Sequence, residues 1–132
     1  MTRSIDVVVA DDHPLLRNGV VRTLQSQDGI DVLGEANDAA SAVKQCITCQ
    51  PDIALVDISM PGGGICAAQE ISMLPRPPRI VMLTVSEAED DVVDALKAGA
   101  HSYVLKGVTA DELVSVIRSI DTDESYVPPS LA

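Results

Sequence analysis

Large aromatic residues and positive charge are both scarce in this sequence. There is no tryptophan or phenylalanine and there are only two tyrosines, although 46% of the 132 residues are hydrophobic. The core must therefore consist of aliphatic side chains, which suits helices packed on a sheet. Nine lysines and arginines stand against twenty aspartates and glutamates, for a net charge of −11. We do not expect a domain this acidic to bind nucleic acid directly.

Long hydrophobic runs and paired cysteines are also missing. No run approaches the roughly 20 apolar residues that a membrane span requires, and the stretch MTRSIDVVVADD becomes acidic too soon for a secretory signal peptide. We therefore predict a cytoplasmic protein with no membrane contact. Cys46, Cys49 and Cys66 are an odd number, which favours free thiols. The CITC motif lies late in a helical pattern, whereas redox CxxC pairs normally begin a helix.

Short apolar runs alternate with longer segments of helical periodicity along the chain. The apolar runs are rich in β-branched residues and nearly continuous, as strands buried on both faces should be. They cover residues 5–10, 30–36, 52–57, 79–85 and 101–106. The helical segments cover residues 14–27, 39–50, 65–74, 87–98 and 110–120. Pro14 suits a first helical turn, and Gly99 follows the fourth helical segment, where a left-handed cap is favoured.

Five strand–helix repeats predict an α/β fold. The expected architecture is a doubly wound (βα)5 sheet of five parallel strands, with right-handed crossovers that place helices on both faces. The periodic pattern ends after Ile120, and the final residues, DTDESYVPPSLA, are acidic and then rich in proline and small residues. We predict one domain over residues 1–121 and a linker or tail over residues 122–132.

Polar residues follow or end four of the five predicted strands. The first strand leads into Asp11 and Asp12, the third ends in Asp57, the fourth contains Thr84 near its end, and the fifth ends in Lys106. Ligands of open parallel sheets bind outside the carboxyl ends of the strands, so these groups should meet at one edge. Crowded carboxylates favour a divalent cation, and Mg2+ prefers oxygen ligands. A lysine and a hydroxyl beside it suit phosphoryl transfer to an aspartate nucleophile.

Each of these residues has an ordinary structural explanation when it is taken alone. An aspartate at a strand end often caps the next helix, a threonine is common in strands, and a lysine is common at the surface. The combination of complementary groups at four strand ends favours a phosphoryl site, with Asp57 as the acceptor.

The motifs VVVADDHP, ALVDISMPGGG, IVMLTVSE and GAHSYVLKG, in this order, closely resemble the receiver domains of bacterial two-component response regulators. The resemblance implies a flavodoxin-like receiver fold with strand order 2-1-3-4-5. It also implies that Asp57 accepts phosphate from a sensor histidine kinase. Asp11, Asp12 and Asp57 would hold Mg2+, together with the backbone carbonyl of Ser59. The domain would catalyse no reaction beyond the phosphorylation and dephosphorylation of its own aspartate.

The same resemblance implies a switch. Thr84 would provide the switch hydroxyl, Lys106 would pair with the phosphate, and Tyr103 would turn inward when Thr84 moves toward the phosphoryl group. The stretches DDHPLLRNGV, LKAGAHSYVLKG and ESYVPPSLA are typical of the NarL/FixJ subfamily, in which the tail leads to a LuxR-type helix-turn-helix. The implied output is transcription regulation through that further domain. Family habit and the aliphatic fifth helix also predict a homodimer on phosphorylation.

Several details depart from the commonest receiver pattern. Gly107 follows Lys106 where many receivers have proline, so a cis peptide is not assured there. MPGGGIC is shorter than the frequent Met-Pro-Gly-x-Asp-Gly form, which leaves the shape of that loop open. We expect its three glycines to let the backbone pass close to a metal and a phosphoryl group. His13 is interpreted as a helix-start residue and His101 as a turn residue.

Two alternatives to a transcription regulator remain open. A haloacid-dehalogenase-type phosphohydrolase also places a nucleophilic aspartate after a parallel strand, but it needs a second aspartate two residues later, where this chain has Ser59. A stand-alone receiver would instead signal by binding another protein. The codons beyond Ala132 would separate this last alternative from a regulator with a helix-turn-helix.

Overall fold

The chain folds into five parallel strands and five helices that alternate along the sequence, as predicted. The computed structural model describes residues 4–85 and 89–122. The strands are β1 (Ile5–Ala10), β2 (Ile30–Ala36), β3 (Ile53–Asp57), β4 (Arg79–Thr84) and β5 (Ser102–Leu105). The helices are α1 (Pro14–Gln25), α2 (Ala39–Cys49), α3 (Gly64–Ser72), α4 (Glu89–Lys97) and α5 (Ala110–Asp121). The sheet order is β2-β1-β3-β4-β5, which confirms the predicted topology.

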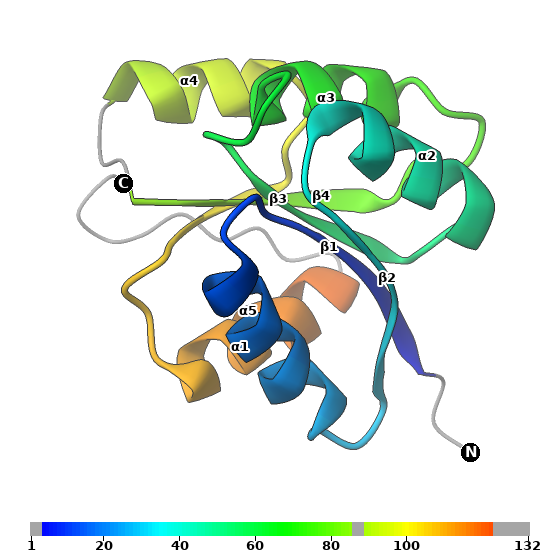
Figure 1. Ribbon diagram of the computed structural model, residues 1–132, viewed down its shortest axis with the longest axis vertical. Coiled ribbons are helices and arrows are strands. Elements are labelled where there is room, and N and C mark those ends of the chain that lie inside the picture. Colours follow the sequence, from blue (N-terminus) through cyan, green and yellow to red (C-terminus); the bar gives the residue numbers. More distant parts are fainter. Residues whose placement is uncertain (1–3, 86–88, 123–132) are drawn as a thin grey trace.

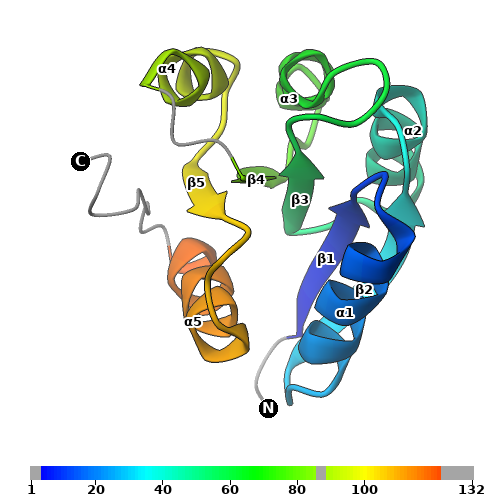
Figure 2. The same ribbon diagram turned by 60° about the vertical axis from the view of Figure 1, so that its left-hand side comes forward.

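The sheet lies between two layers of helices. Helices α2, α3 and α4 cover one face, and α1 and α5 cover the other (Figures 1 and 2). Alternate residues of each central strand point to opposite faces, so β3 sends Ala54 and Val56 to the first layer and Ile53 and Leu55 to the second. The two resulting cores are almost entirely aliphatic, and Tyr103 is buried in the one beneath α2, α3 and α4.

Local sequence explains where the helices start and end. Pro14 is the first residue of α1. Asp38 accepts a hydrogen bond from the Ser41 backbone N–H in a capping box at the start of α2. Thr109 caps α5 by accepting from the Glu112 backbone N–H. Gly99 has φ of 107° just after α4, the left-handed conformation predicted there.

The prediction that every strand is buried on both faces is wrong for β2. Asp31, Leu33 and Glu35 are exposed, and their neighbours are more buried. This strand forms one edge of the sheet and pairs only with β1, and its exposed face carries the charged Asp31 and Glu35. Its register shifts opposite Val7 and Val8, and such an irregularity is common in edge strands. Burial on both faces holds for the three central strands and also for β5, the other edge strand, where only the last residue is partly exposed.

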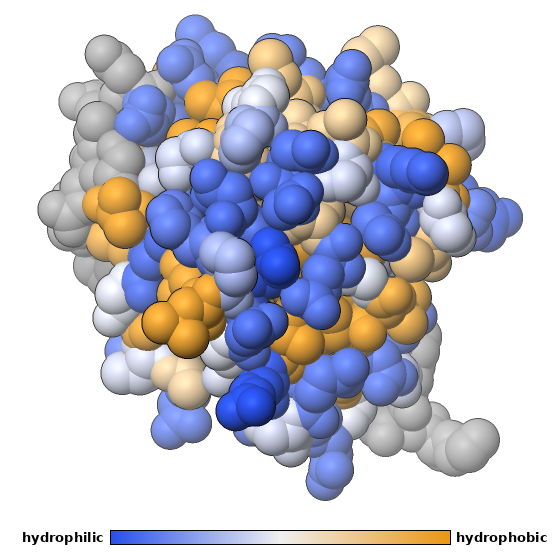
Figure 3. Space-filling view, in the orientation of Figure 1, coloured by the Kyte–Doolittle hydropathy of each residue, from blue (hydrophilic) through white to orange (hydrophobic). Residues whose placement is uncertain are grey.

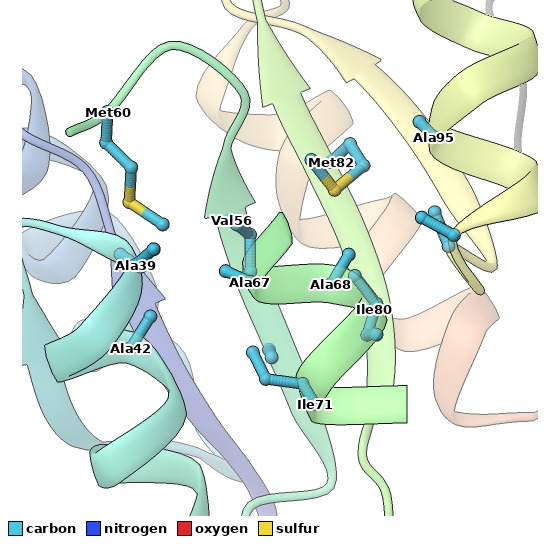
Figure 4. Close-up of a cluster of buried hydrophobic side chains, with 14 of the residues drawn as sticks. Ala39, Ala42, Val56, Met60, Ala67, Ala68, Ile71, Ile80, Met82 and Ala95 are labelled. Carbon is cyan, nitrogen blue, oxygen red and sulfur yellow. The ribbon is translucent and has the colours of Figure 1, made fainter. Parts of the chain in front are cut away.

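A close-packed group of small side chains supports the carboxyl end of β3. Met60, on the loop after β3, reaches toward Ala39 of α2, and Val56 and Met82 lie beside the alanines of α3 (Figure 4). Met60 is only 2% exposed. The loop that follows Asp57 is thus fixed to the core by its methionine.

The surface mixes polar and apolar side chains. Hydrophilic residues fill the middle of the face in Figure 3, with hydrophobic residues beside them. Large exposed hydrophobic residues occur on separate elements, among them Leu15, Met73 and Val85. No helix in the described part of the chain is long and apolar enough to cross a bilayer. Most of the predicted tail, residues 123–132, and the start predicted for the fourth helix lie outside the described residues.

Candidate functional site

The predicted site residues meet at the carboxyl edge of the sheet. Asp11 directly follows β1, Asp57 ends β3, Thr84 ends β4 and Lys106 directly follows β5. The parallel register places these ends side by side, since Asp57 is opposite Leu83 and Thr84 is opposite Leu105. The carboxylates of Asp11 and Asp57 are buried, and each is 1% exposed or less. The fold therefore brings together the groups that the sequence predicted to converge.

Lys106 joins two of these carboxylates. Its Nζ is 3.2 Å from Asp57 Oδ1 and 3.1 Å from Asp11 Oδ2, and its side chain is 8% exposed. One ammonium thus faces two buried acids, so the cluster keeps an excess of negative charge. No peptide bond in the described ranges is cis, and that between Lys106 and Gly107 is therefore trans.

The environment of Asp57 works against its ionisation. Burial raises the pKa of Asp57, and the negative charge of Asp11 raises it further. A hydrogen bond from the Ser59 backbone N–H and the charge of Lys106 act in the opposite direction. The net shift is upward from the ordinary value of 3.8, so the carboxylate is held at an electrostatic cost that a cation would relieve.

The acidic cluster fits a divalent cation. Ligand atoms of Asp11, Asp12, His13 and Asp57 all lie within 4.8 Å of one another. Among the described residues, Asp12 Oδ1 is buried and accepts no hydrogen bond, and the buried Asp11 Oδ2 has the Lys106 ammonium as its ion-pair partner. Buried carboxylate oxygens without donors are costly, and oxygen-rich sites of this kind suit Mg2+. The donor set and the unsatisfied oxygen of Asp12 therefore agree with the predicted metal.

Ser59 contacts the acceptor in a way that its sequence position did not predict. Its backbone N–H donates to Asp57 Oδ1 at 3.2 Å, and its hydroxyl lies 3.2 and 3.3 Å from the two carboxylate oxygens. The sequence had suggested only its carbonyl, as a metal ligand, and that role stays a prediction. The available signal was the spacing, because a hydroxyl two residues after an aspartate can turn back onto it.

The glycine loop after Asp57 is tight because of backbone contacts. A Cβ on Gly64 would overlap the Asp57 carbonyl, and one on Gly62 would lie 2.8 Å from the Ala39 Cβ. Gly62 and Gly63 both have φ of 87°, which L residues rarely adopt. The Ala39 backbone N–H donates to the Pro61 carbonyl at 2.9 Å. These glycines thus let the loop pack closely against the Asp57 backbone and against α2. The predicted approach of this loop to a metal and a phosphoryl group stays a prediction.

Thr84 and Tyr103 lie on the same side of the sheet. Thr84 continues the alternation of Ile80 and Met82, which belong to the core beneath α3 and α4, and Tyr103 belongs to that core as well. Thr84 is 3% exposed and Tyr103 is fully buried. The aromatic side chain is therefore directed inward here, and its predicted coupling to Thr84 stays a prediction.

Both histidines take part in contacts of their own. His13 is the N-cap residue of α1, which confirms its helix-start role, and its ring also contacts the acidic cluster. His101 precedes β5, and its Nδ1 accepts a hydrogen bond from the Ile80 backbone N–H at 3.2 Å. Next to the cluster, Arg17 donates to the Asp11 carbonyl at 2.7 Å and pairs with Glu35 at 3.1 Å. The Arg17 contacts could not be predicted from the sequence, because they depend on how α1 lies beside β2.

Comparison with known proteins agrees with this geometry. The family model described as response regulator receiver domain matches residues 7–118. The response regulator UvrY of Escherichia coli is 40% identical over 97% of this chain and 59% of its own length. The probable transcriptional regulatory protein NarL of Mycobacterium tuberculosis is 37% identical over 96% of this chain and 59% of its own. The chain thus spans about three fifths of these relatives.

A solved structure matches equally well. The two-component response regulator of the LuxR family from an Aurantimonas species superposes with a TM-score of 0.91 and 32% identity, over 97% of this chain and 92% of that one. The fold, the acidic edge and the family match lead to the same assignment. The chain belongs to the response regulator receiver domain family, with relatives of the NarL/LuxR type.

Proposed function

We propose that this receiver domain accepts a phosphoryl group on Asp57 from a sensor histidine kinase and changes its surface in response. The observation that carries the proposal is the contact of Lys106 Nζ with Asp57 at 3.2 Å and Asp11 at 3.1 Å, beside a group of possible metal ligands that lie within 4.8 Å of one another. This arrangement holds a nucleophile beside a fixed positive charge and beside oxygens that can bind a divalent cation.

The transfer exchanges one bond to phosphorus for another. A carboxylate oxygen of Asp57 attacks the phosphorus of the donor's phosphohistidine, and the P–N bond breaks with its electron pair leaving on the imidazole nitrogen. Lys106 would pair with the transferred oxygens, and the Ser59 hydroxyl is near enough to reorient toward them. Asp11, Asp12, Asp57 and the Ser59 carbonyl would hold Mg2+, which supplies charge neutralisation.

Phosphorylation would add roughly −1.5 to −2 charge at Asp57, and Thr84 and Lys106 are placed to respond. Thr84 ends β4 and Lys106 follows β5, so a shift of either passes directly to α4 and the β5–α5 segment. Tyr103 would follow Thr84 because both lie on one side of the sheet. We propose that this change controls a LuxR-type helix-turn-helix beyond residue 132. The transcriptional relatives, which extend further than this chain, support that output.

The homodimer remains part of the proposal, but the aliphatic fifth helix does not support it. The aliphatic face of α5 is not available to a partner, because Leu113, Val114, Val116, Ile117 and Ile120 are buried within the domain. Exposed apolar residues do occur on α4, at Val93 and Leu96, and Val85 directly follows Thr84. Light scattering with and without beryllofluoride tests assembly, and an unchanged monomer in both conditions would count against it.

The central experiment is incubation of the protein with Mg2+ and a small phosphodonor such as acetyl phosphate. We expect stable, stoichiometric aspartyl phosphate on Asp57 by intact mass, and no label on the Asp57→Asn variant. Rapid multiple turnover of phosphomonoesters would instead support the phosphohydrolase alternative. A cytoplasmic location goes with the proposal, because histidine kinases draw their phosphate from ATP.

A further inference from the structure

The ring of His13 lies in the acidic cluster, but the proposed phosphoryl transfer gives it no role. Its Nδ1 is within hydrogen-bond distance of Asp11 Oδ1, at 3.2 Å, and lies 3.1 Å from Asp12 Oδ1. Two ligands bound at right angles to one ion, each at about 2.1 Å, lie about 3.0 Å apart. The nitrogen and the two carboxylate oxygens thus have the spacing of neighbouring ligands around a single cation.

The backbone fixes His13 in this place. Its N–H donates to Asp11 Oδ1 at 2.8 Å, and Pro14 follows as the first residue of α1. His13 occupies the N-cap position, where Ser, Thr, Asp or Asn usually accept a hydrogen bond from the helix, but its side chain makes no such bond. Helix capping therefore does not use the ring, and its 62% exposure leaves it accessible to ions from solvent.

One neighbouring oxygen still lacks a hydrogen-bond partner. Among the described residues, Asp12 Oδ1 is buried and accepts no hydrogen bond, although the His13 nitrogen is 3.1 Å away. The approach of Nδ1 to this oxygen therefore does not satisfy it. Asp11 Oδ2 is also buried, and it is paired with the Lys106 ammonium at 3.1 Å. A metal ion at the meeting point of these atoms would satisfy Asp12 Oδ1 and use the imidazole lone pair together.

We propose that His13 is a nitrogen ligand of this metal site and gives it a preference for first-row transition ions such as Co2+ over Mg2+. The inference rests on the metal site proposed above. Imidazole suits transition ions, whereas Mg2+ takes oxygen ligands and keeps several waters. In the Mg2+ form the ring would remain beside the ion, and in the Co2+ form it would enter the coordination sphere.

The test compares Co2+ and Mg2+ affinities of the untagged protein and its His13→Asn variant by titration calorimetry. Asparagine is a good N-cap residue, so the variant keeps the start of α1. We expect the Co2+ affinity to fall by about tenfold or more, and the Mg2+ affinity to change by less than about twofold. The visible absorption spectrum of bound Co2+ should also change.

His101→Asn is the matched control, because His101 is exposed and lies before β5, away from the carboxyl edge. It should leave both affinities unchanged. An unchanged Co2+ affinity in His13→Asn, or an equal loss for the two ions, would overturn the role of His13. Failure of the wild-type protein to bind Mg2+ would overturn the underlying metal site, so the two failures are distinguishable.

Discussion

The two edges of the sheet both carry charged residues, but they use them differently. At the amino edge, Asp52 accepts a hydrogen bond from the Asp6 backbone N–H at 2.9 Å, and Arg79 donates to the carbonyls of Ile120 and Asp121 at 2.7 and 3.0 Å. At the carboxyl edge, the carboxylates of Asp11 and Asp57 share one lysine, and Asp12 Oδ1 accepts no hydrogen bond from the part of the chain that the structure describes.

The difference separates charge that stabilises the fold from charge held for a ligand. Polar groups at the amino edge contribute to stability, because they close helix and strand ends. Those at the carboxyl edge lower stability until a cation or a phosphoryl group arrives. Substitutions at the amino edge should therefore change stability without changing phosphorylation. Substitutions at the carboxyl edge should lower both stability and phosphorylation, or raise stability while they abolish phosphorylation.

The largest effect should come from Gly64→Ala at the carboxyl edge. The new Cβ would overlap the Asp57 carbonyl and lie 2.7 Å from the Ile58 Cα, and neither backbone atom can move without displacing the acceptor. We expect a loss of about 3 kcal/mol in the free energy of unfolding and slower phosphorylation by acetyl phosphate. Urea denaturation and intact-mass kinetics measure the two quantities.

Gly19→Ala is the matched control. Gly19 lies within α1, and an added Cβ meets nothing within 4 Å. Stability should rise by roughly 0.5–1 kcal/mol, because alanine loses less backbone entropy in a helix. If Gly64→Ala folded and accepted phosphate as the wild type does, the tight fit of the loop to Asp57 would be wrong.

Arg79→Ala tests the amino edge. The substitution removes both hydrogen bonds to the last carbonyls of α5, so we expect the free energy of unfolding to fall by about 1–2 kcal/mol. Phosphorylation should proceed at the wild-type rate. Arg76→Ala is the control, since Arg76 is exposed nearby and its loss should cost less than about 0.5 kcal/mol. An equal loss of stability in the two variants would show that the hydrogen bonds of Arg79 to α5 do not stabilise the fold.

Asp57→Asn should raise the free energy of unfolding in the absence of metal, by less than Arg79→Ala lowers it. The pKa of Asp57 is higher in the folded state than its ordinary 3.8, so the folded state binds more protons as the carboxyl titrates. Ionised Asp57 therefore lowers stability once the pH has risen through the folded pKa, and it has no such cost below about pH 3.8. The variant should be more stable than the wild type near neutral pH, and the gain should shrink as the pH falls.

Urea denaturation from about pH 4 to pH 8, with a chelator present, measures this gain. Asp31→Asn controls for the loss of one negative charge, because Asp31 is exposed on β2. A gain that is constant over the whole range, or a loss near neutral pH, would show that Asp57 is not held at an electrostatic cost.

The strands and helices could be predicted from the sequence better than the contacts between them. Continuous apolar runs such as 53–56 are typical of strands buried on both faces, so they indicated the parallel sheet and its order of elements. Boundaries differed by one or two residues, because helix ends depend on caps. The burial of β2 was misjudged, although the order 2-1-3-4-5 already placed it at an edge and Asp31 and Glu35 alternate with its apolar residues.

In the site, residue types and their convergence were predictable, and their contacts were not. Asp57 and Lys106 meet because parallel strands end at one edge. The Ser59 hydroxyl contact and the position of the His13 ring depend on the backbone of two loops. Gly64 was singled out as a loop residue, but only the structure shows that the Asp57 carbonyl is what excludes a side chain there.

The smallest expected effect concerns the cysteines, and it compares α2, which precedes β3 in the sequence, with α3, which follows it. Cys66 is exposed in the first turn of α3, close to the carboxyl edge, and Cys46 is buried in the last turns of α2. Burial raises the pKa of Cys46 to about 12, with a further contribution from Cys49. Iodoacetamide near pH 8 should therefore label Cys66 and leave Cys46 thiol-protonated and unlabelled until the protein is unfolded. Peptide mass spectrometry before and after urea gives the order in which the cysteines are labelled. Labelling of Cys46 in the folded protein would contradict the prediction. A Cys46–Cys49 disulfide formed under mild oxidation would support a redox role for the CITC motif.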